Sequence, residues 1–349
     1  MKRKLGDLAI IVKSKDSVEK IDRNKYVTTE NMISNRGGVS FPSSTVPKQN
    51  KLDTFDKDDV LVSNIRPYFK KIWKAPFSGY KSGDVLAFRT KDRDILSQEY
   101  LYILLESDRF FEYMTTTAKG TKMPRGDKKA IAEFPFDLPS IDIQKKRSHQ
   151  IEVIEQKISL NQQINANLLE LAKTLFSEEF SSNEEVLLSN YLLPKRGKNL
   201  LKKNVVSGEF PVIAGGLKPA AFHNSYNTKA PVITISASGA NAGYVQIWGQ
   251  PVWSSDSSYI DTSITKDIYF WYLLLKKYQK QIFDAQTGSA QPHIYPKHIG
   301  NLLIPNISED SIKNFNITIT PIFKKIFQNK NENNKLKAIK NSLLIKYFN

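Results

Sequence analysis

Residues 164–180, "INANLLELAKTLFSEEF", and residues 333–348, "NNKLKAIKNSLLIKYF", are two amphipathic stretches with related sequences. When the second stretch is aligned with the first by a shift of 168 residues, Leu168 falls on Leu336. The same shift relates further residues on the N-terminal side of both stretches, and it needs no gap. The chain therefore contains an internal duplication, and this property comes before any other in predicting the fold.

Both stretches continue a helical pattern in which apolar residues and asparagines recur alternately every three and four positions. Because 168 is a multiple of seven, the two copies have the same heptad positions, and Ala172 and Lys340 occupy equivalent ones. Asparagine buried in a coiled coil fixes its register at a cost in stability. We therefore expect two long helices that pair as an antiparallel coiled coil. The residues expected at the helix contact are Ile154, Ile158, Asn161, Asn165, Leu168, Leu175, Ile322, Ile326, Asn329, Asn333, Leu336 and Leu343.

A proline interrupts the second copy of the helical pattern near its start. Because proline is favoured in the first turn of a helix and disfavoured in the interior, Pro321 predicts that this helix begins around Thr320. Thr320 would then be the N-cap residue.

Length and composition limit the class of protein. At 349 residues the chain has room for about two ordinary domains. The absence of cysteine excludes disulfides and thiolate metal sites, and no signal peptide or membrane-spanning run is recognisable. The net charge of +16 and the pI of about 9.6 favour a polyanionic partner such as nucleic acid. We therefore expect a cytoplasmic protein that binds DNA and no membrane.

Each half has a β-rich region, a dense apolar helix, a glycine loop and the long helix. Strand-like runs such as "DVLVSNI", "GDVLAF", "PVITIS" and "GYVQIW" alternate with turn residues. "EYLYILLESDRFFEYM" and "IYFWYLLLKKYQKQIF" are each expected as one helix. The glycine loops begin at Gly120 and Gly288. The predicted fold is α/β (α+β) with a pseudo-twofold repeat. The predicted ranges are 1–140 and 182–307 for the β-rich domains, and 141–181 and 308–349 for the helices.

This order of parts resembles the specificity subunit of type I restriction-modification systems over nearly the whole chain. The most specific pieces are "KLGDLAIIV", "GDKKAIAEFPFDLPSIDIQ", "SGEFPVIAGG" and "GSAQPHIYPKHIGNLLIP", and none is a catalytic signature. The resemblance implies two target recognition domains that each read one half of a split DNA sequence. It also implies that the paired helices hold these domains apart and bind methyltransferase subunits.

The resemblance further implies partners and a division of labour. The partners would be double-stranded DNA, two methyltransferase subunits and, through the complex, restriction subunits. The chain itself would be non-catalytic and hold no cofactor or metal, while partner subunits would use S-adenosylmethionine, ATP and Mg. The residues agree, because the Asn- or Asp-Pro-Pro-aromatic turn of an adenine methyltransferase is missing. The four histidines also lack metal-ligand spacing.

Sequence-specific binding needs donors and acceptors at base edges and separate basic groups for phosphates. Both halves carry such residues after a strand and in the glycine loop, although Ser, Asn and Gly also form turns without any ligand, so about half of the candidates are expected to touch nothing. Aromatic residues between Tyr68 and Trp73 could stack on an extruded base or lie in the core. The candidate DNA-binding residues are Ser63, Asn64, Arg66, Lys70, Lys122, Arg125, Lys128, Lys129, Lys218, Ser236, Ser238, Asn241, Gln291, His293 and Lys297.

Two other functions remain open from the sequence. One is a coiled-coil scaffold that binds proteins without DNA specificity, and such a scaffold would show no salt-dependent affinity for DNA. The other is a stand-alone DNA methyltransferase, which would bind the methyl donor by itself.

The helix pair generates a first prediction about the DNA target. A helix of about thirty residues is roughly 45 Å long, comparable to about thirteen base pairs at 3.4 Å each, so it is expected to set the spacing of two half-sites. Four residues inserted after Asn165 should add about 6 Å. Methylome sequencing should then show an unread gap longer by one or two base pairs between unchanged half-sites. An active complex with the original gap would contradict this prediction.

Overall fold

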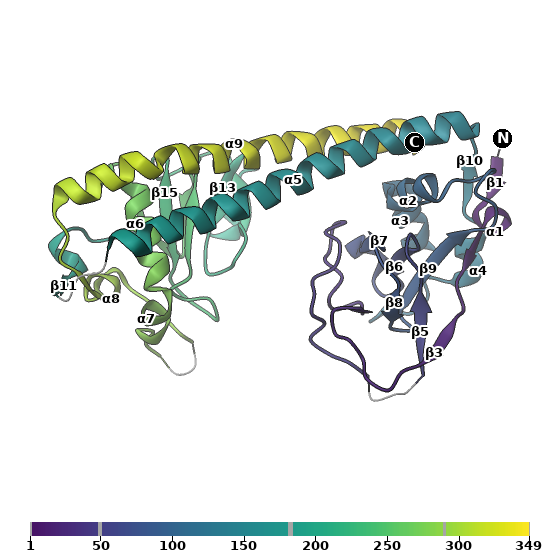
Figure 1. Ribbon diagram of the computed structural model, residues 1–349, viewed down its shortest axis with the longest axis horizontal. Helices are drawn as coiled ribbons and strands as arrows, with labels where there is room; N and C mark the ends of the chain where they lie inside the picture. Colours follow the sequence, from purple (N-terminus) through teal and green to yellow (C-terminus); the bar gives the residue numbers. More distant parts are fainter. Residues whose placement is uncertain (1, 48–50, 181–183, 289–290, 349) are drawn as a thin grey trace. The chain divides into compact units, whose positions relative to one another are not determined.

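The computed structural model describes residues 2–47, 51–180, 184–288 and 291–348 (Figure 1). The chain forms two compact units, one of Met1–Ile158 with Asn334–Asn349 and one of Ser159–Asn333. The division falls within both long helices, so each unit contains one β-rich region and a segment of each helix. The start of the linker at 181–183 and two residues of the second glycine loop lie outside the described residues. In the described part of the chain, no helix is long and apolar enough to cross a membrane.

The first unit has three layers, in which a central sheet lies between two helices and a second sheet (Figure 1). Successive side chains of a strand point to opposite faces. Val60 and Val62 accordingly pack with the helices, whereas Leu61 packs in a separate cluster with Phe55 of the second sheet. The central sheet is β2 (Ala9–Ile11), β9 (Val85–Thr90), β6 (Val60–Ser63) and β7 (Ile72–Lys74); the second is β3 (Lys15–Ser17), β5 (Lys51–Phe55), β8 (Gly79–Lys81) and β4 (Tyr26–Val27); the helices are α2 (Gln98–Glu106) and α3 (Asp108–Thr116).

The second unit repeats these layers with the same strand order in its central sheet. Ile233 and Ile235 pack in the large core with the helices, and Val232 packs with Ile213 of the second sheet. The central sheet is β12 (Lys195–Arg196), β18 (Ser257–Asp261), β15 (Val232–Ser236) and β16 (Val245–Trp248); the second is β14 (Ala221–His223), β13 (Phe210–Ile213) and β17 (Trp253–Ser254); the helices are α6 (Ile268–Lys277) and α7 (Gln279–Asp284).

A two-stranded sheet closes each domain at the point where the long helix begins. Its strands pair in an antiparallel register, and the equivalent pairs are Arg3 with Phe136 and Val186 with Ile304. The strands are β1 (Lys2–Lys4) with β10 (Pro135–Asp137), and β11 (Glu185–Leu187) with β19 (Leu303–Pro305). The remaining short helices are α1 (Leu5–Leu8), α4 (Lys128–Ala132), α8 (Pro296–Gly300), η1 (Pro67–Phe69), η2 (Leu188–Asn190) and η3 (Lys202–Asn204).

The predicted strands are confirmed, but each dense apolar segment is two helices instead of one. In the first half the break is at Ser107, which has extended backbone, and its hydroxyl accepts a hydrogen bond from the Phe110 amide at 3.2 Å. Serine favours this N-cap role because its side chain satisfies an amide that lacks a partner within the helix. In the second half the break is at Tyr278. The apolar pattern continues through both breaks, and for this reason it did not indicate them.

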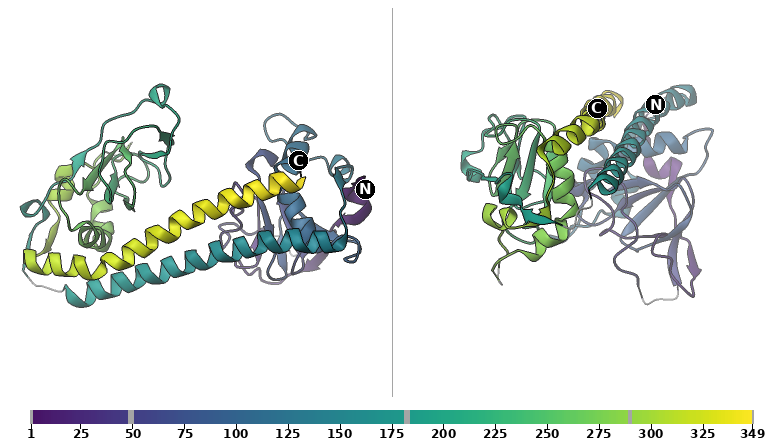
Figure 2. Two further views of the ribbon diagram at one scale, coloured as in Figure 1. Left: turned by 90° about the horizontal axis from the view of Figure 1, so that it is seen from above. Right: turned by 60° about the vertical axis from the view of Figure 1, so that its left-hand side comes forward.

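The long helices are α5 (Ile141–Glu179) and α9 (Glu309–Phe348), close to the predicted ranges and longer than the roughly thirty residues used in the estimate of half-site spacing. Within the second unit the Asn161 amide donates to Asn333 at 2.9 Å, and the Asn329 amide donates to Asn165 at 2.8 Å. Asn165 follows Asn161 along α5, whereas its partner Asn329 precedes Asn333 along α9. The helix segments are therefore antiparallel, as Figure 2 also shows. The predicted pairing and its asparagine contacts are therefore confirmed.

The predicted start of the second long helix around Thr320 is wrong, because α9 begins at Glu309 and contains Pro321 in its interior. Proline removes the hydrogen bond to the carbonyl four residues earlier, that of Ile317. Ile317 and Pro321 both lie on the exposed face, where water can bind this carbonyl. The opposite face holds the helix in place through buried Phe315 and Phe323. Thr320 is not an N-cap, and its hydroxyl instead donates to the Asn316 carbonyl at 2.6 Å.

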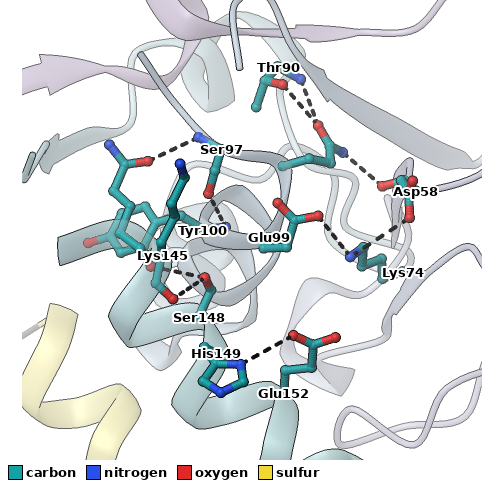
Figure 3. Close-up of polar contacts among 12 residues, drawn as sticks. Asp58, Lys74, Thr90, Ser97, Glu99, Tyr100, Lys145, Ser148, His149 and Glu152 are labelled. Carbon is teal, nitrogen blue, oxygen red and sulfur yellow. Dashed lines mark hydrogen bonds and ion pairs between the residues drawn. The ribbon is translucent and has the colours of Figure 1, made fainter. Parts of the chain in front are cut away.

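A buried amide side chain joins each long helix to the N-terminus of the first apolar helix of its domain. In the first unit Gln144 accepts from the Ser97 amide at 3.0 Å, and Ser97 in turn caps α2 at Tyr100 (Figure 3). In the second unit the side-chain oxygen of Asn316 accepts from the backbone amides of Tyr269 and Phe270 at 3.0 and 3.2 Å. These contacts satisfy amides that lack partners at a helix start, and they fix the angle at which domain and helix meet.

Replacing Asn316 by Ala should lower the free energy of unfolding by about 1–3 kcal/mol, because two buried amides lose their acceptor. The control is Asn314→Ala on the exposed face of the same helix, which should change stability by less than about 0.5 kcal/mol. Urea or thermal unfolding measures both. Equal effects from the two variants would show that Asn316 is not a structural cap.

Candidate nucleic-acid interface

In the first unit the end of the central strand β6 is held by the glycine loop. The Gly126 amide donates to the Asn64 carbonyl at 3.1 Å, and the Arg66 amide donates to the Pro124 carbonyl at 2.8 Å. A Cβ at Gly126 would lie 2.8 Å from the Asn64 side-chain oxygen, so this close approach requires glycine. The loop itself starts at Gly120, whose φ is +91°. Two regions singled out in the sequence therefore meet at one place.

The second unit builds the same junction from different residues. The Ile294 amide donates to the Ala237 carbonyl at 3.0 Å, and the Gly239 amide donates to the Pro292 carbonyl at 3.0 Å. The loop residues keep the 168-residue shift, whereas the strand ends differ by 173 residues, as Ser63 differs from Ser236. The scaffold of the candidate site is therefore duplicated even where the sequence alignment is not.

The turn that follows the strand has the same unusual backbone in both units. Arg66 and Lys70 have φ values of +49° and +50°, and their equivalents Gly239 and Gly243 have +78° and +86°. Left-handed backbone costs glycine little, but it costs other residues about 1–3 kcal/mol each and is concentrated at functional sites. In the first unit this conformation is therefore retained although two basic residues occupy it.

Two predicted DNA-binding cations of the first unit are held by acidic residues. Lys70 forms an ion pair with Asp108, which Arg36 also contacts at 2.6 Å. The Lys70 ammonium, together with Arg36, holds the pKa of Asp108 below its usual range. Arg125 contacts Asp84 at 3.1 Å. These pairs brace the turn and the glycine loop, and Arg36 is a residue of this site that the sequence analysis missed. Its signal was the "NRGG" turn at 35–38.

Lys122, Lys128 and Lys129 are exposed, as expected for phosphate contacts. Lys128 and Lys129 lie in the first turn of α4 and not in the glycine loop. The Asp127 carboxylate caps this helix by accepting from the Lys129 amide at 2.9 Å. The helix start thus presents the lysines on a rigid element next to the glycine loop.

Several predicted readers are buried at the strand ends. Ser63, Asn64 and Ser236 are at most 6% exposed. Among the described residues, the side-chain oxygens of Asn64 and Ser236 and the Nε of Arg66 are buried without a hydrogen-bond partner. A buried polar atom in this state requires an explanation. They lie just after β6, in the turn that follows it and at the end of β15.

The predicted residues of the second unit are partly engaged. The Ser238 hydroxyl bonds Asp256, and the Asn241 amide donates weakly to the Gly215 carbonyl at 3.4 Å. Arg196, missed as a site residue, contacts Asp256 at 2.7 Å because β12 pairs with β18. His293 is half-buried beside Tyr295, with ring centroids 6.1 Å apart. The exposed predicted residues of this unit are Lys218, Gln291 and Lys297.

Comparison with known proteins agrees with this arrangement. The family model for the type I restriction modification DNA specificity domain matches residues 1–170. The chain is 24% identical over 336 residues to a putative type I specificity subunit of Mycoplasma pneumoniae, covering 89% of this chain and 87% of that protein. It is 24% identical over 344 residues to the specificity subunit of the type I restriction enzyme MjaIX of Methanocaldococcus jannaschii, covering 86% and 78%.

The fold is similar to that of the type I restriction-modification S subunit from M. genitalium, with a TM-score of 0.61 and 18% identity over 100% of this chain and 96% of that chain. The chain carries the type I restriction modification DNA specificity domain over residues 1–170. As a specificity subunit it serves DNA recognition in a restriction-modification system. The individual base and phosphate contacts given above stay predictions.

The exposed lysines of the specificity subunit should contribute affinity more than sequence preference. Replacing Lys128 and Lys129 by Ala should weaken binding to all DNA sequences and reduce the slope of log affinity against log salt by about 1–2. The control, Lys145→Ala with Lys146→Ala, removes the same charge from exposed positions on α5. Titrations at several salt concentrations measure both. If the two variants gave the same slope, the effect would be one of net charge and not of this site.

Proposed function

We propose that each unit reads one half of a split DNA sequence and that the two halves differ. The observation that carries this proposal is a duplicated scaffold with unlike side chains on it. The turn in the first unit presents Arg66 and Tyr68, whereas the equivalent positions in the second unit are Gly239 and Asn241. A shared backbone sets where each turn meets the DNA, and the side chains determine which bases are accepted.

The first unit is suited to contacts that use long side chains. Tyr68 and Phe69 are 47% and 38% exposed on the turn, with ring centroids 4.8 Å apart. Trp73, by contrast, packs against Phe41 and belongs to the core. An exposed aromatic pair beside Arg66 supports contacts to base faces or to the thymine methyl group as well as to phosphate.

The second unit is suited to close approach of the backbone. Its turn is built from small residues, and a Cβ added at Gly239 would meet no atom within 4 Å. Open space at this position allows a base edge to come near the main-chain amides and the side chain of Asn241. Such contacts use hydrogen bonds rather than stacking.

The outer faces of the long helices supply the proposed contacts to two methyltransferase subunits, through which restriction subunits join the complex. Both long helices carry exposed apolar side chains, which a bound partner would cover. We assign to the chain no catalytic group, cofactor or metal; the partner subunits would supply S-adenosylmethionine, ATP and Mg chemistry in the cytoplasm. The exposed apolar residues are Ile143, Val153, Leu160, Leu171, Ile317, Ile339 and Ile345.

Exchange of residues 1–140 for another recognition domain tests this function in the assembled methyltransferase. The boundary precedes α5, which begins at Ile141. Methylome sequencing should show one half of the methylated motif changed and the other half and the gap retained. Exchange of residues 184–307 is the matched reciprocal control and should change only the other half. If either exchange altered both halves, the two units would not be independent readers.

A further inference from the structure

A buried ion cluster joins the C-terminal part of α9 to the first domain. Lys340 bonds the carboxylates of Glu106, at the end of α2, and Glu155 of α5. Glu106 is fully buried, and the Lys340 side chain is 12% exposed. The Tyr102 hydroxyl adds hydrogen bonds to Glu155 at 3.0 Å and to Glu106 at 3.4 Å. We refer to Glu106, Glu155 and Lys340 as the ion cluster.

The positions 168 residues away in the second unit form an apolar contact. Glu106 corresponds to Leu274, Glu155 to Phe323, and Lys340 to Ala172. These three counterparts are at most 1% exposed and belong to one hydrophobic core. Tyr102 likewise corresponds to a phenylalanine of that core, at position 270. The two domains therefore contact the helix pair at equivalent positions of the repeat, but one contact is ionic and the other is apolar.

The asparagine contacts of the helix pair do not distinguish one helix from the other. Asn161 of α5 bonds Asn333, and Asn165 bonds Asn329. Because Asn333 is the repeat equivalent of Asn165, a second copy of α5 presents asparagines at matching positions. The residues at the helix contact alone would therefore also permit α5 to pair with α5 of another chain, and α9 with α9 of another chain.

The ion cluster makes those like-with-like pairs unfavourable. If α5 of a second chain replaced α9 on the first domain, Ala172 would face Glu106 and the one-third-exposed Glu155, and the fully buried Glu106 would lose its cation. If α9 of a second chain replaced α5 on the second domain, Lys340 would face Leu274 and Phe323. An unpaired buried charge is strongly destabilising, whereas the pair itself adds little net stability. Specificity of pairing is the best-supported use of such groups.

We propose that Glu106, Glu155 and Lys340 select the partner helix, so that each chain pairs its own α5 with its own α9 and rejects a second copy of itself. The selection is independent of DNA recognition. The selection rests on two unfavourable contacts, one in each unit, namely Ala172 against the glutamates and Lys340 against the apolar core. Exchanging the residues at positions 172 and 340 makes both contacts favourable.

The test is the full chain with Ala172→Lys and Lys340→Ala together, a change that leaves the composition and net charge unaltered. In this variant pairing within one chain places alanine against the glutamates of the first domain and lysine against the apolar core of the second. Pairing of α5 with α5 and of α9 with α9 between two chains restores the favourable contact at both domains. Light scattering should show dimers or larger closed species, with an associated fraction about tenfold or more above that of the native chain. Each single substitution should lower stability without this association.

A second readout identifies which helices pair. The chain has no cysteine, so Ile164→Cys, next to the contact residue Asn165 on α5, reports contact between two copies of α5 through a short thiol cross-linker. Cross-linking should be strong in the double variant and weak in the native background. A folded double variant that stays monomeric without cross-links overturns the proposal, and so does equal cross-linking in both backgrounds.

If the double variant does not fold, the test is a comparison of the melting temperatures of Lys340→Ala and a control, Lys337→Ala. Lys337 is exposed on the same helix. Burial raises the pKa of Glu106 and Lys340 opposes this rise; Glu155 and Arg36 are the other charged neighbours. Without Lys340 the pKa of Glu106 rises further, so Glu106 takes up a proton when the chain folds. Lys340→Ala should therefore lower the melting temperature more at pH 8 than at pH 5. If Lys340→Ala and Lys337→Ala lower the melting temperature equally at both pH values, the proposal is wrong.

Discussion

The two asparagine pairs between α5 and α9 are the constraint from which the rest of the structure follows. An antiparallel seam of isoleucine and leucine alone would tolerate a shift by one heptad, because apolar side chains fit many neighbours. Asn161 with Asn333 and Asn165 with Asn329 allow one register, since any other leaves buried amides without partners. That register brings Lys340 to Glu155, and Glu106 of α2 completes the contact.

The sequence was sufficient for the elements whose pattern is local. Heptad spacing predicted both long helices and their asparagine contacts, and alternating apolar runs predicted strands such as β6 and β15. It failed where tertiary contacts override a local rule. Pro321 remains inside α9 because Phe315 and Phe323 hold that segment against the core, and the break at Ser107 interrupts an apolar pattern that continues on both sides.

The candidate site was predictable as two regions but not as a set of contacts. Glycine loops and post-strand turns were visible in the sequence, and the structure brings them together in both units. Which cations remain available was not visible, because Lys70 meets Asp108 and Arg125 meets Asp84 only in the folded chain. The burial of Ser63 and Ser236 likewise follows from their places at strand ends in the centre of a sheet.

The break at Ser107 explains how one short segment serves both the reading turn and the helix pair. A continuous helix would place Glu106 and Asp108 about 200° apart on one rod, with their directions fixed by its axis. The extended backbone of Ser107 ends α2 and starts α3 in a new direction. Glu106 can then be buried against Lys340, while Asp108 holds Lys70 of the turn. Arg36 connects the two by donating to the Glu106 carbonyl at 2.7 Å and contacting Asp108. The turn is thus braced against the same residues that anchor α9, so a recognition domain can vary its surface side chains freely only while it keeps this junction.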